Sequence, residues 1–128
     1  MTEDGGNRRT VRSFVRRAGR MTASQEKALA ELWPTWGIEY TDSLLDLDAC
    51  FGRAAPRVLE IGFGNGDTLV QAAAAHPELD YIGIEVHEPG VGHCLIKARE
   101  ANVTNLRVIT HDAIDVMRHQ LPDGALSR

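Results

Sequence analysis

Residues 58–66, with the sequence VLEIGFGNG, decide the fold of this chain. Their apolar first half is typical of a buried strand, and the glycines that follow are typical of a tight turn that opens a helix. Glu85 stands 25 positions after Glu60, at the end of the next apolar run, YIGIE at 81–85. A strand, a glycine-rich turn and an acid after the following strand together predict a nucleotide site. Bare backbone approaches the ligand in such a site, and the carboxylate binds ribose hydroxyls.

The same strand-and-helix unit repeats along the chain from Arg57 onward. Strands are expected at 57–61, 81–85 and 106–110, and helices at 67–76, 91–101 and 113–121. This alternation predicts an α/β fold with a parallel sheet, right-handed crossovers and apolar strands covered on both faces. Upstream, the spacing from Thr22 to Gln25 predicts a capped helix that Pro34 stops. We expect residues 33–56 to form an irregular or short-helical segment packed over the sheet.

Three strands make up half of a doubly wound sheet, and the strand at 57–61 would be central in the complete fold. In this chain its outer side is predicted to be an open edge. We therefore expect the chain to be a fragment or a truncated copy of a longer protein. The expected organisation is a basic, flexible arm at 1–20, a helical or irregular extension at 21–56, and one α/β domain portion at 57–128.

The charge of the chain is distributed unevenly. The formal net charge is −4, yet residues 1–20 hold six arginines against Glu3 and Asp4, so the arm carries +4 and the remainder −8. A basic arm on an acidic body indicates that the arm meets a polyanion, although a solvated tail explains the charge alone equally well. Phe14 and Val15 within the arginine run favour RNA, because such a segment can become ordered by stacking and phosphate pairing.

Several classes of protein are disfavoured by the sequence. No apolar run approaches the roughly 18–20 residues of a membrane span, and the amino terminus lacks the apolar core of a signal peptide. Cys50 and Cys94 have neither a CxxC spacing nor the density of a disulfide scaffold, so we expect a reducing cytoplasm. His87 and His93 lack metal-binding spacing, which argues against a metal site. The absence of GxSxG argues against a serine hydrolase.

The spacing of the glycines distinguishes between nucleotides. A dinucleotide fingerprint would place its third glycine at position 67, where the chain has Asp67, and a carboxylate at a helix amino terminus suits a pyrophosphate poorly. Gly62, Gly64 and Gly66 instead form an E-x-G-x-G-x-G loop, a pattern associated with S-adenosylmethionine. The sulfonium and amino groups of that molecule are cationic and favour a carboxylate such as Glu60. A tight turn without a ligand is the alternative interpretation.

Two further acids are expected at the same crevice. Glu85 is placed to accept hydrogen bonds from both ribose hydroxyls, and Asp112, after the third strand, could accept the adenine amino group. The alternatives are a solvated loop acid for Glu85 and a helix N-cap for Asp112. Because the carboxyl ends of adjacent parallel strands share one edge, Glu60, Glu85 and Asp112 are predicted to line one crevice.

Several stretches of the chain match a known family. They are RSFVRR at 12–17 with Gly19 and Arg20, LEIGFG at 59–64, GIEVHEPGVG at 83–92, and NLRV at 105–108 with HDA at 111–113. By these stretches the chain resembles the amino-terminal half of the bacterial tRNA (guanine-N7-)-methyltransferases. The segment at 83–92 is specific to this family, whereas the glycine loop alone would indicate only a methyltransferase.

The resemblance implies a Rossmann-like, S-adenosylmethionine-dependent methyltransferase fold, here with only its first three βα units. It implies methylation of N7 of a guanosine in the tRNA variable loop, and cofactor binding at positions that include Glu60, Glu85 and Asp112. The candidate RNA-binding residues are in the arm, at Arg12, Arg16, Arg17 and Arg20. The catalytic residue is unknown, because the family's Pro-Asp-Pro-Trp segment would follow Arg128.

Other hypotheses remain open from the sequence. The chain could be inactive, or could bind cofactor or RNA without catalysis; a small-molecule methyltransferase and a nicotinamide dehydrogenase are further alternatives. The oligomeric state stays open, a monomer included.

Overall fold

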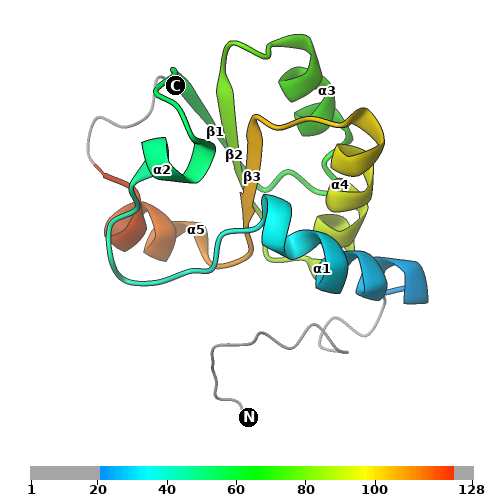
Figure 1. Ribbon diagram of the computed structural model, residues 1–128. Coiled ribbons are helices and arrows are strands. Elements are labelled where there is room, and N and C mark those ends of the chain that lie inside the picture. The colour runs from blue at the N-terminus through cyan, green and yellow to red at the C-terminus, as the bar shows by residue number, and fades with distance from the viewer. Residues whose placement is uncertain (1–20, 123–128) are drawn as a thin grey trace.

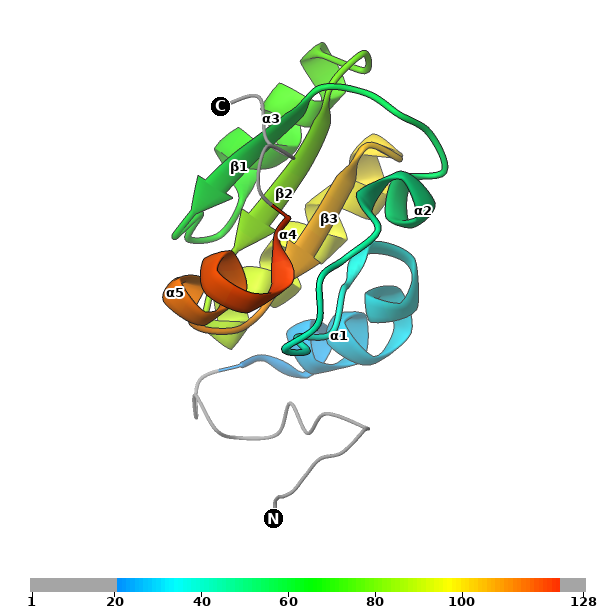
Figure 2. The ribbon, with the colours of Figure 1, turned by 90° about the vertical axis from the view of Figure 1, so that its left-hand side faces the viewer.

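A computed structural model describes residues 21–122, with a parallel three-stranded sheet at its centre. The strand order is β1 (Arg57–Ile61), β2 (Asp80–Ile84), β3 (Leu106–Ile109). Helices α3 (Asp67–Ala75) and α4 (Glu88–Ala101) cover one face of the sheet, while α2 (Leu47–Phe51) and α5 (Ala113–Asp115) lie on the other (Figures 1 and 2). This is a partial Rossmann-like α/β fold, as predicted. Within residues 21–122, β1 pairs only with β2, so its outer side is unpaired in that part of the chain.

The sheet is apolar on both faces because its strands alternate between two hydrophobic clusters. Every residue of β2 is buried. Tyr81 belongs to the cluster beneath α3 and α4, and Ile82 and Ile84 belong to the cluster beneath α2 and α5. Gly83 lies on the first side, where a Cβ would come within 2.7 Å of the Phe63 ring. A strand buried in this way shows the near-continuous apolar run seen in the sequence.

Helix α1 (Ala23–Trp36) packs against α4 and continues past Pro34. The predicted capping box is present, since the Thr22 hydroxyl accepts from the Gln25 amide at 3.1 Å. The prediction that Pro34 stops the helix is wrong. Trp33 and Trp36, on either side of the proline, are both buried, and the Trp36 indole donates to the carbonyl of Val103 at 3.0 Å. Burial of two indoles offsets the single helix hydrogen bond that a proline in the last turn removes.

Two other predicted boundaries differ from the structure. Helix α4 begins at Glu88 rather than at 91, because Pro89 fits the first turn of a helix, where no amide hydrogen is needed. The helix predicted at 113–121 is a single turn, α5, followed by a π-helical turn, η1 (Val116–Gln120). The remaining predicted strand and helix boundaries are correct to within one residue.

The segment between α1 and α2 runs beside β3. Gly37 forms a parallel bridge with Val108, and the Ile38 amide donates to the carbonyl of Val108 at 2.8 Å. Further along, the Leu45 amide donates to the carbonyl of Gln120 at 2.8 Å. The segment therefore borders the sheet at β3 and then reaches η1.

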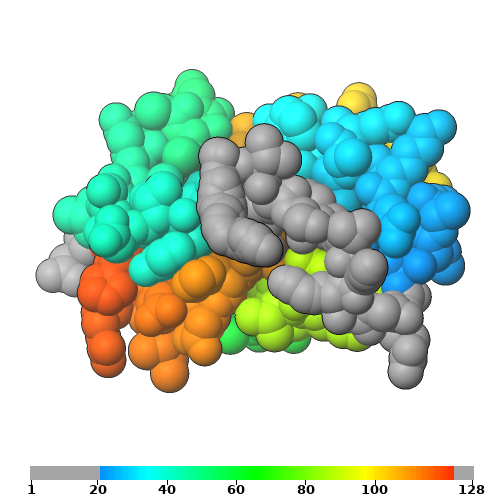
Figure 3. All heavy atoms as spheres, turned by 90° about the horizontal axis from the view of Figure 1, so that it is seen from below, coloured from blue at the N-terminus to red at the C-terminus, as the bar shows by residue number. Residues whose placement is uncertain are grey.

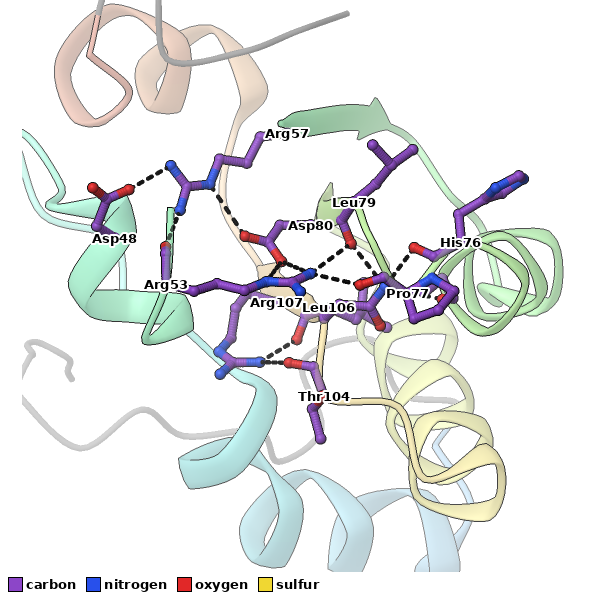
Figure 4. Close-up of polar contacts among 12 residues, drawn as sticks. Asp48, Arg53, Arg57, His76, Pro77, Leu79, Asp80, Thr104, Leu106 and Arg107 are labelled. Carbon is purple, nitrogen blue, oxygen red and sulfur yellow. Dashed lines mark hydrogen bonds and ion pairs between the residues drawn. The ribbon is translucent and has the colours of Figure 1, made fainter. Parts of the chain in front are cut away.

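A buried ionic network ties the amino edge of the sheet together. Asp80 is fully buried at the start of β2 and accepts from Arg53 at 2.7 Å and from Arg57 at 3.3 Å (Figure 4). Arg57 also donates to Asp48 of α2 at 2.8 Å. Charges removed from water must be paired, so the network is a structural feature of this edge. The candidate site lies at the carboxyl edge, at the other end of the strands.

Candidate functional site

The residues that follow the three strands emerge at one edge of the sheet. The strand pairing continues past the strand ends, since the Gly62 amide donates to the Ile84 carbonyl at 2.8 Å and the Glu85 amide donates to the Ile109 carbonyl at 3.1 Å. In Figure 1 the carboxyl ends of the strands form the lower edge of the sheet. Seen from below in Figure 3, α5 (orange) and the residues around the start of α4 (yellow-green) lie next to each other there.

The loop after β1 is built from glycines in the left-handed region. The φ angles of Gly62, Gly64 and Gly66 are 70°, 67° and 81°. Other residues adopt such angles rarely and at a cost, which explains the glycines even without a ligand. At Gly62 and Gly64 a Cβ would meet nothing within 4 Å. The loop therefore presents bare backbone to open space, as a close-approaching ligand requires.

Glu85 joins the loop after β1 to the loop after β2. Its Oε1 accepts from the Gly64 amide at 2.7 Å, and its Oε2 accepts from the amides of Val86 and His87, both at 3.0 Å. A carboxylate offers about four acceptor positions. Three are used here, so Oε1 keeps one acceptor position for a further donor. The structure brings Glu85 and the predicted glycine loop into direct contact.

Negative charge gathers beneath the glycine loop. Burial, together with the nearby carboxylates of Asp67 and Glu60, raises the pKa of Cys94 from 9.0 to about 12. Glu60 is half-buried in β1, and Asp67 opens α3, where it contacts His93 with 2.9 Å between Oδ1 and Nε2. Two carboxylates at this place favour a cationic group and oppose a phosphate.

Asp112 caps α5. Its Oδ1 accepts from the Ile114 amide at 2.8 Å, so the N-cap interpretation is confirmed. The side chain is exposed, and a cap of this kind leaves acceptor positions for another donor. The preceding residue, His111, stacks on Tyr40 with ring centroids 3.7 Å apart and contacts Asp115 at 3.1 Å.

Four residues outside the predicted site also support this edge. Tyr40 stacks on His111 beside Asp112, Gly90 and Cys94 of α4 lie against the glycine loop, and His93 of α4 contacts Asp67 at the start of α3. The helical spacing of Gly90, His93 and Cys94 places them on one face of α4 and could have suggested a shared role. The candidate RNA-binding residues, Arg12, Arg16, Arg17 and Arg20, lie outside the described residues.

Among residues 21–122, no group of three or more His, Cys, Asp or Glu side chains could hold a metal ion. None of the helices in that part of the chain has both the length and the apolar character needed to cross a membrane.

Comparisons with known proteins place the chain among methyltransferases. A family model described as "Putative methyltransferase" matches residues 54–128. The tRNA (guanine-N(7)-)-methyltransferase of Aeromonas hydrophila is 61% identical over 125 residues, which are 98% of this chain and 53% of that protein. The corresponding protein of Vibrio cholerae is 58% identical, over 98% of this chain and 52% of its own length. That of Halorhodospira halophila is 56% identical, over 92% of this chain and 52% of its own length. The chain thus spans about half the length of the curated relatives it matches.

Proposed function

This chain belongs to a methyltransferase family, and from that premise we propose that it binds S-adenosylmethionine for the methylation of tRNA at guanine N7. The single observation that carries the cofactor proposal is the contact between Glu85 and Gly64. It joins an acid to bare backbone at the edge where ligands bind in open α/β sheets. The tRNA substrate is proposed from the names of relatives that are about twice as long as this chain.

The residues at this edge fit S-adenosylmethionine better than a dinucleotide. No Cβ stands near the open backbone at Gly62 and Gly64, so an adenosine-sized ligand can approach it. The carboxylates of Glu60 and Asp67 supply the negative charge that a cationic sulfonium and amino group favour. A pyrophosphate at the start of α3 would face the Asp67 carboxylate, which makes a nicotinamide cofactor a poor fit.

Five of the six candidate cofactor-binding residues contact the ligand in this proposal, while Gly66 packs against Cys94 of α4. Glu85 accepts from a ribose hydroxyl through its remaining acceptor position, and Asp112 accepts from the adenine amino group beside its capping bond. Glu60 offsets the cationic charge, and Gly62 and Gly64 let the ligand approach the backbone. When bound, S-adenosylmethionine supplies an activated methyl group on a positively charged sulfur.

The reaction mainly requires that the methyl donor and guanine N7 be oriented correctly toward each other. Guanine N7 carries a lone pair at neutral pH, so the nucleophile needs no general base. Holding the reacting atoms in line at attack distance can contribute roughly 7–11 kcal/mol to lowering the barrier. In this proposal, residues 57–122 hold the methyl donor, and Arg12, Arg16, Arg17 and Arg20 hold tRNA phosphates. We place the reaction in the cytoplasm with its tRNA substrate.

Calorimetric titration with S-adenosylhomocysteine tests the cofactor proposal. We expect saturable binding with one site per chain, and we expect Glu85→Ala to weaken it by about tenfold or more, because a hydrogen bond to a charged group is worth about 1.5–3 kcal/mol. Glu78→Ala is the matched control, since Glu78 is an exposed acid at the opposite edge of the sheet. Absence of heat at millimolar ligand would overturn the cofactor proposal.

Methyl transfer tests the substrate proposal. Labelled S-adenosylmethionine and unmodified tRNA are incubated with the chain, and the tRNA is then cleaved chemically at 7-methylguanosine. Cleavage at one variable-loop guanosine supports the proposal. Cofactor binding without transfer would favour the alternative that this chain binds its ligands without catalysis. Retention of tRNA affinity after replacement of all four arm arginines by alanine would contradict the role of the arm.

A further inference from the structure

One face of α4 lies directly beneath the glycine loop. Gly90, His93 and Cys94 share this face, since their spacing of three and four residues returns to the same side of a helix. Each of the three lies against a different residue of the loop or of the start of α3. Gly90 lies against Gly64, Cys94 against Gly66, and His93 against Asp67.

Gly90 sets how closely the loop approaches the helix. A Cβ at Gly90 would lie 2.1 Å from the carbonyl oxygen of Gly64, which is far inside contact distance. The amide on the other side of Gly64 is the one bound by Glu85 at 2.7 Å. Gly64 is thus held from both sides, by the backbone of α4 and by the candidate ribose-binding acid.

His93 and Cys94 hold the next part of the loop. The Cys94 side chain is fully buried against Gly66, where an added Cβ would lie 2.5 Å from both Cβ and Sγ of the cysteine. His93 contacts Asp67 with 2.9 Å between Nε2 and Oδ1, at the first residue of α3. The end of the loop is therefore fixed by packing at Gly66 and by a polar contact at Asp67.

We propose that Gly90, His93 and Cys94 are positioning residues that fix the shape of the glycine loop for cofactor binding. Binding sites need their supporting groups held to within about 0.5 Å, and here one rigid helix supplies that support. The inference about loop shape stands on the contacts alone, whereas its consequence for affinity rests on the proposed function. The two are therefore tested by separate measurements.

Gly90→Ala is the direct test, and Gly92→Ala is its matched control. Both glycines lie inside α4, where alanine has the higher helix propensity. A Cβ at Gly92 would meet Gln25 of α1 at 3.1 Å, on a different side of the helix from the glycine loop. We expect Gly90→Ala to weaken S-adenosylhomocysteine binding by about tenfold or more, and Gly92→Ala by less than about twofold. Equal affinities for the two variants would overturn the proposal.

Amide hydrogen exchange without any ligand tests the loop itself. The amides of Gly64 and Gly66 are both hydrogen-bonded, to Glu85 and to the carbonyl of Phe63. We expect Gly90→Ala to speed their exchange by about tenfold while the Tyr81 amide, bonded to Asn105 in the sheet, keeps its wild-type rate. Unchanged exchange at Gly64 and Gly66 would reject the proposal even if the wild-type protein bound no cofactor. If the wild-type protein bound no cofactor but Gly90→Ala still sped exchange at Gly64 and Gly66, the inference about loop shape would stand and the proposed function would fail.

Variants at His93 keep the proposal testable if Gly90→Ala does not fold. His93 is half-buried at the protein surface, so its replacement leaves the core intact. We expect His93→Leu to speed exchange at Gly66 and to weaken cofactor binding about threefold to tenfold, and His93→Gln to restore both, because glutamine can donate to Asp67. Lys97→Leu, one turn further along α4, is the control. If His93→Leu and Lys97→Leu had the same exchange rate at Gly66 and the same cofactor affinity, His93 would not be a positioning residue.

Discussion

The Oε1 atom of Glu85 accepts a hydrogen bond of 2.7 Å from the amide of Gly64 and so connects the ends of two neighbouring strands. The contact lies between the loop after β1 and the loop after β2, which no local sequence signal links. It means that Glu85 shapes the glycine loop as well as offering an acceptor to a ligand. Substitutions at Glu85 are therefore expected to change both the ligand contact and the surface that surrounds it.

Glu85→Gln should weaken cofactor binding although it preserves the size of the side chain. A glutamine has one oxygen and one NH₂ group, so it cannot accept from Gly64 and from the amides of Val86 and His87 at the same time. Losing a charge-assisted bond costs about 1.5–3 kcal/mol, which corresponds to an affinity loss of roughly tenfold or more. Calorimetry with S-adenosylhomocysteine measures this loss, with exposed Glu100→Gln on α4 as the control. Wild-type affinity in Glu85→Gln would show that the charge is not needed.

Asp80→Asn should lower stability without changing the candidate site. Asp80 is fully buried between Arg53 and Arg57, and removing its charge takes a carboxylate partner from both guanidinium groups, although Arg57 keeps its ion pair with Asp48. Breaking a buried pair in this way costs about 3–5 kcal/mol of unfolding free energy. Asp48→Asn is the matched control, because its carboxylate is 62% exposed and such pairs contribute about 0–1 kcal/mol. Urea unfolding measures both.

The affinity of Asp80→Asn for S-adenosylhomocysteine tests whether the two edges of the sheet are independent of each other. The Asp80 network lies at the amino edge, and the candidate site lies at the carboxyl edge, so the folded fraction of Asp80→Asn should bind S-adenosylhomocysteine with wild-type affinity. A loss of affinity beyond the loss of folded protein would mean that the two edges are coupled.

Tyr40→Ala should weaken cofactor binding, while Tyr40→Phe should not. The Tyr40 ring stacks on His111, which precedes Asp112, and the tyrosine hydroxyl is not needed for the stack. An aromatic pair contributes about 0.5–1.5 kcal/mol beyond its buried area, so releasing the turn should cost roughly threefold to tenfold in affinity. Equal affinities of the alanine and phenylalanine variants would show that the stack does not support Asp112.

Much of the fold was predictable because its signals are local. The apolar run before Gly62 and the acid after the next strand are set by neighbouring residues, and the structure places both as expected. Pro34 was misjudged because its cost is offset by Trp36, whose partner is Val103, far along the chain. A rule that considers only the residues next to a proline in the sequence cannot include such a contact.

Helical spacing suggests that Gly90, His93 and Cys94 share one face, but which residues they contact was not predictable, for the same reason. That Gly90 lies against Gly64 depends on how α4 crosses the sheet, and the sequence presents the Pro89-Gly90 pair as a turn signal. The pairing of His93 with Asp67 likewise joins two helices that are separate in the sequence. Local patterns predict which loop forms a site, whereas tertiary packing decides which residues hold that loop.

Raising the pH above 9 should destabilise the fold through Cys94. Burial, together with the carboxylates of Asp67 and Glu60, raises the pKa of this thiol from 9.0 to about 12, so the folded state keeps the proton that the unfolded state releases. The folded state then binds more protons than the unfolded state between pH 9 and pH 12, and the free energy of unfolding falls with pH in that window. Below pH 9 the contribution of Cys94 to stability is fully present. Within the window above pH 9, the fall in unfolding free energy caused by this group approaches about 1.4 kcal/mol per pH unit.

Cys94→Ala should lose this slope, whereas Cys50→Ala should keep it, because Cys50 is only half-buried and lies in α2. Urea unfolding of the three proteins at pH 8, 9.5 and 11 measures the difference, and parallel pH profiles for wild type and Cys94→Ala would show that the thiol ionises freely in the folded protein.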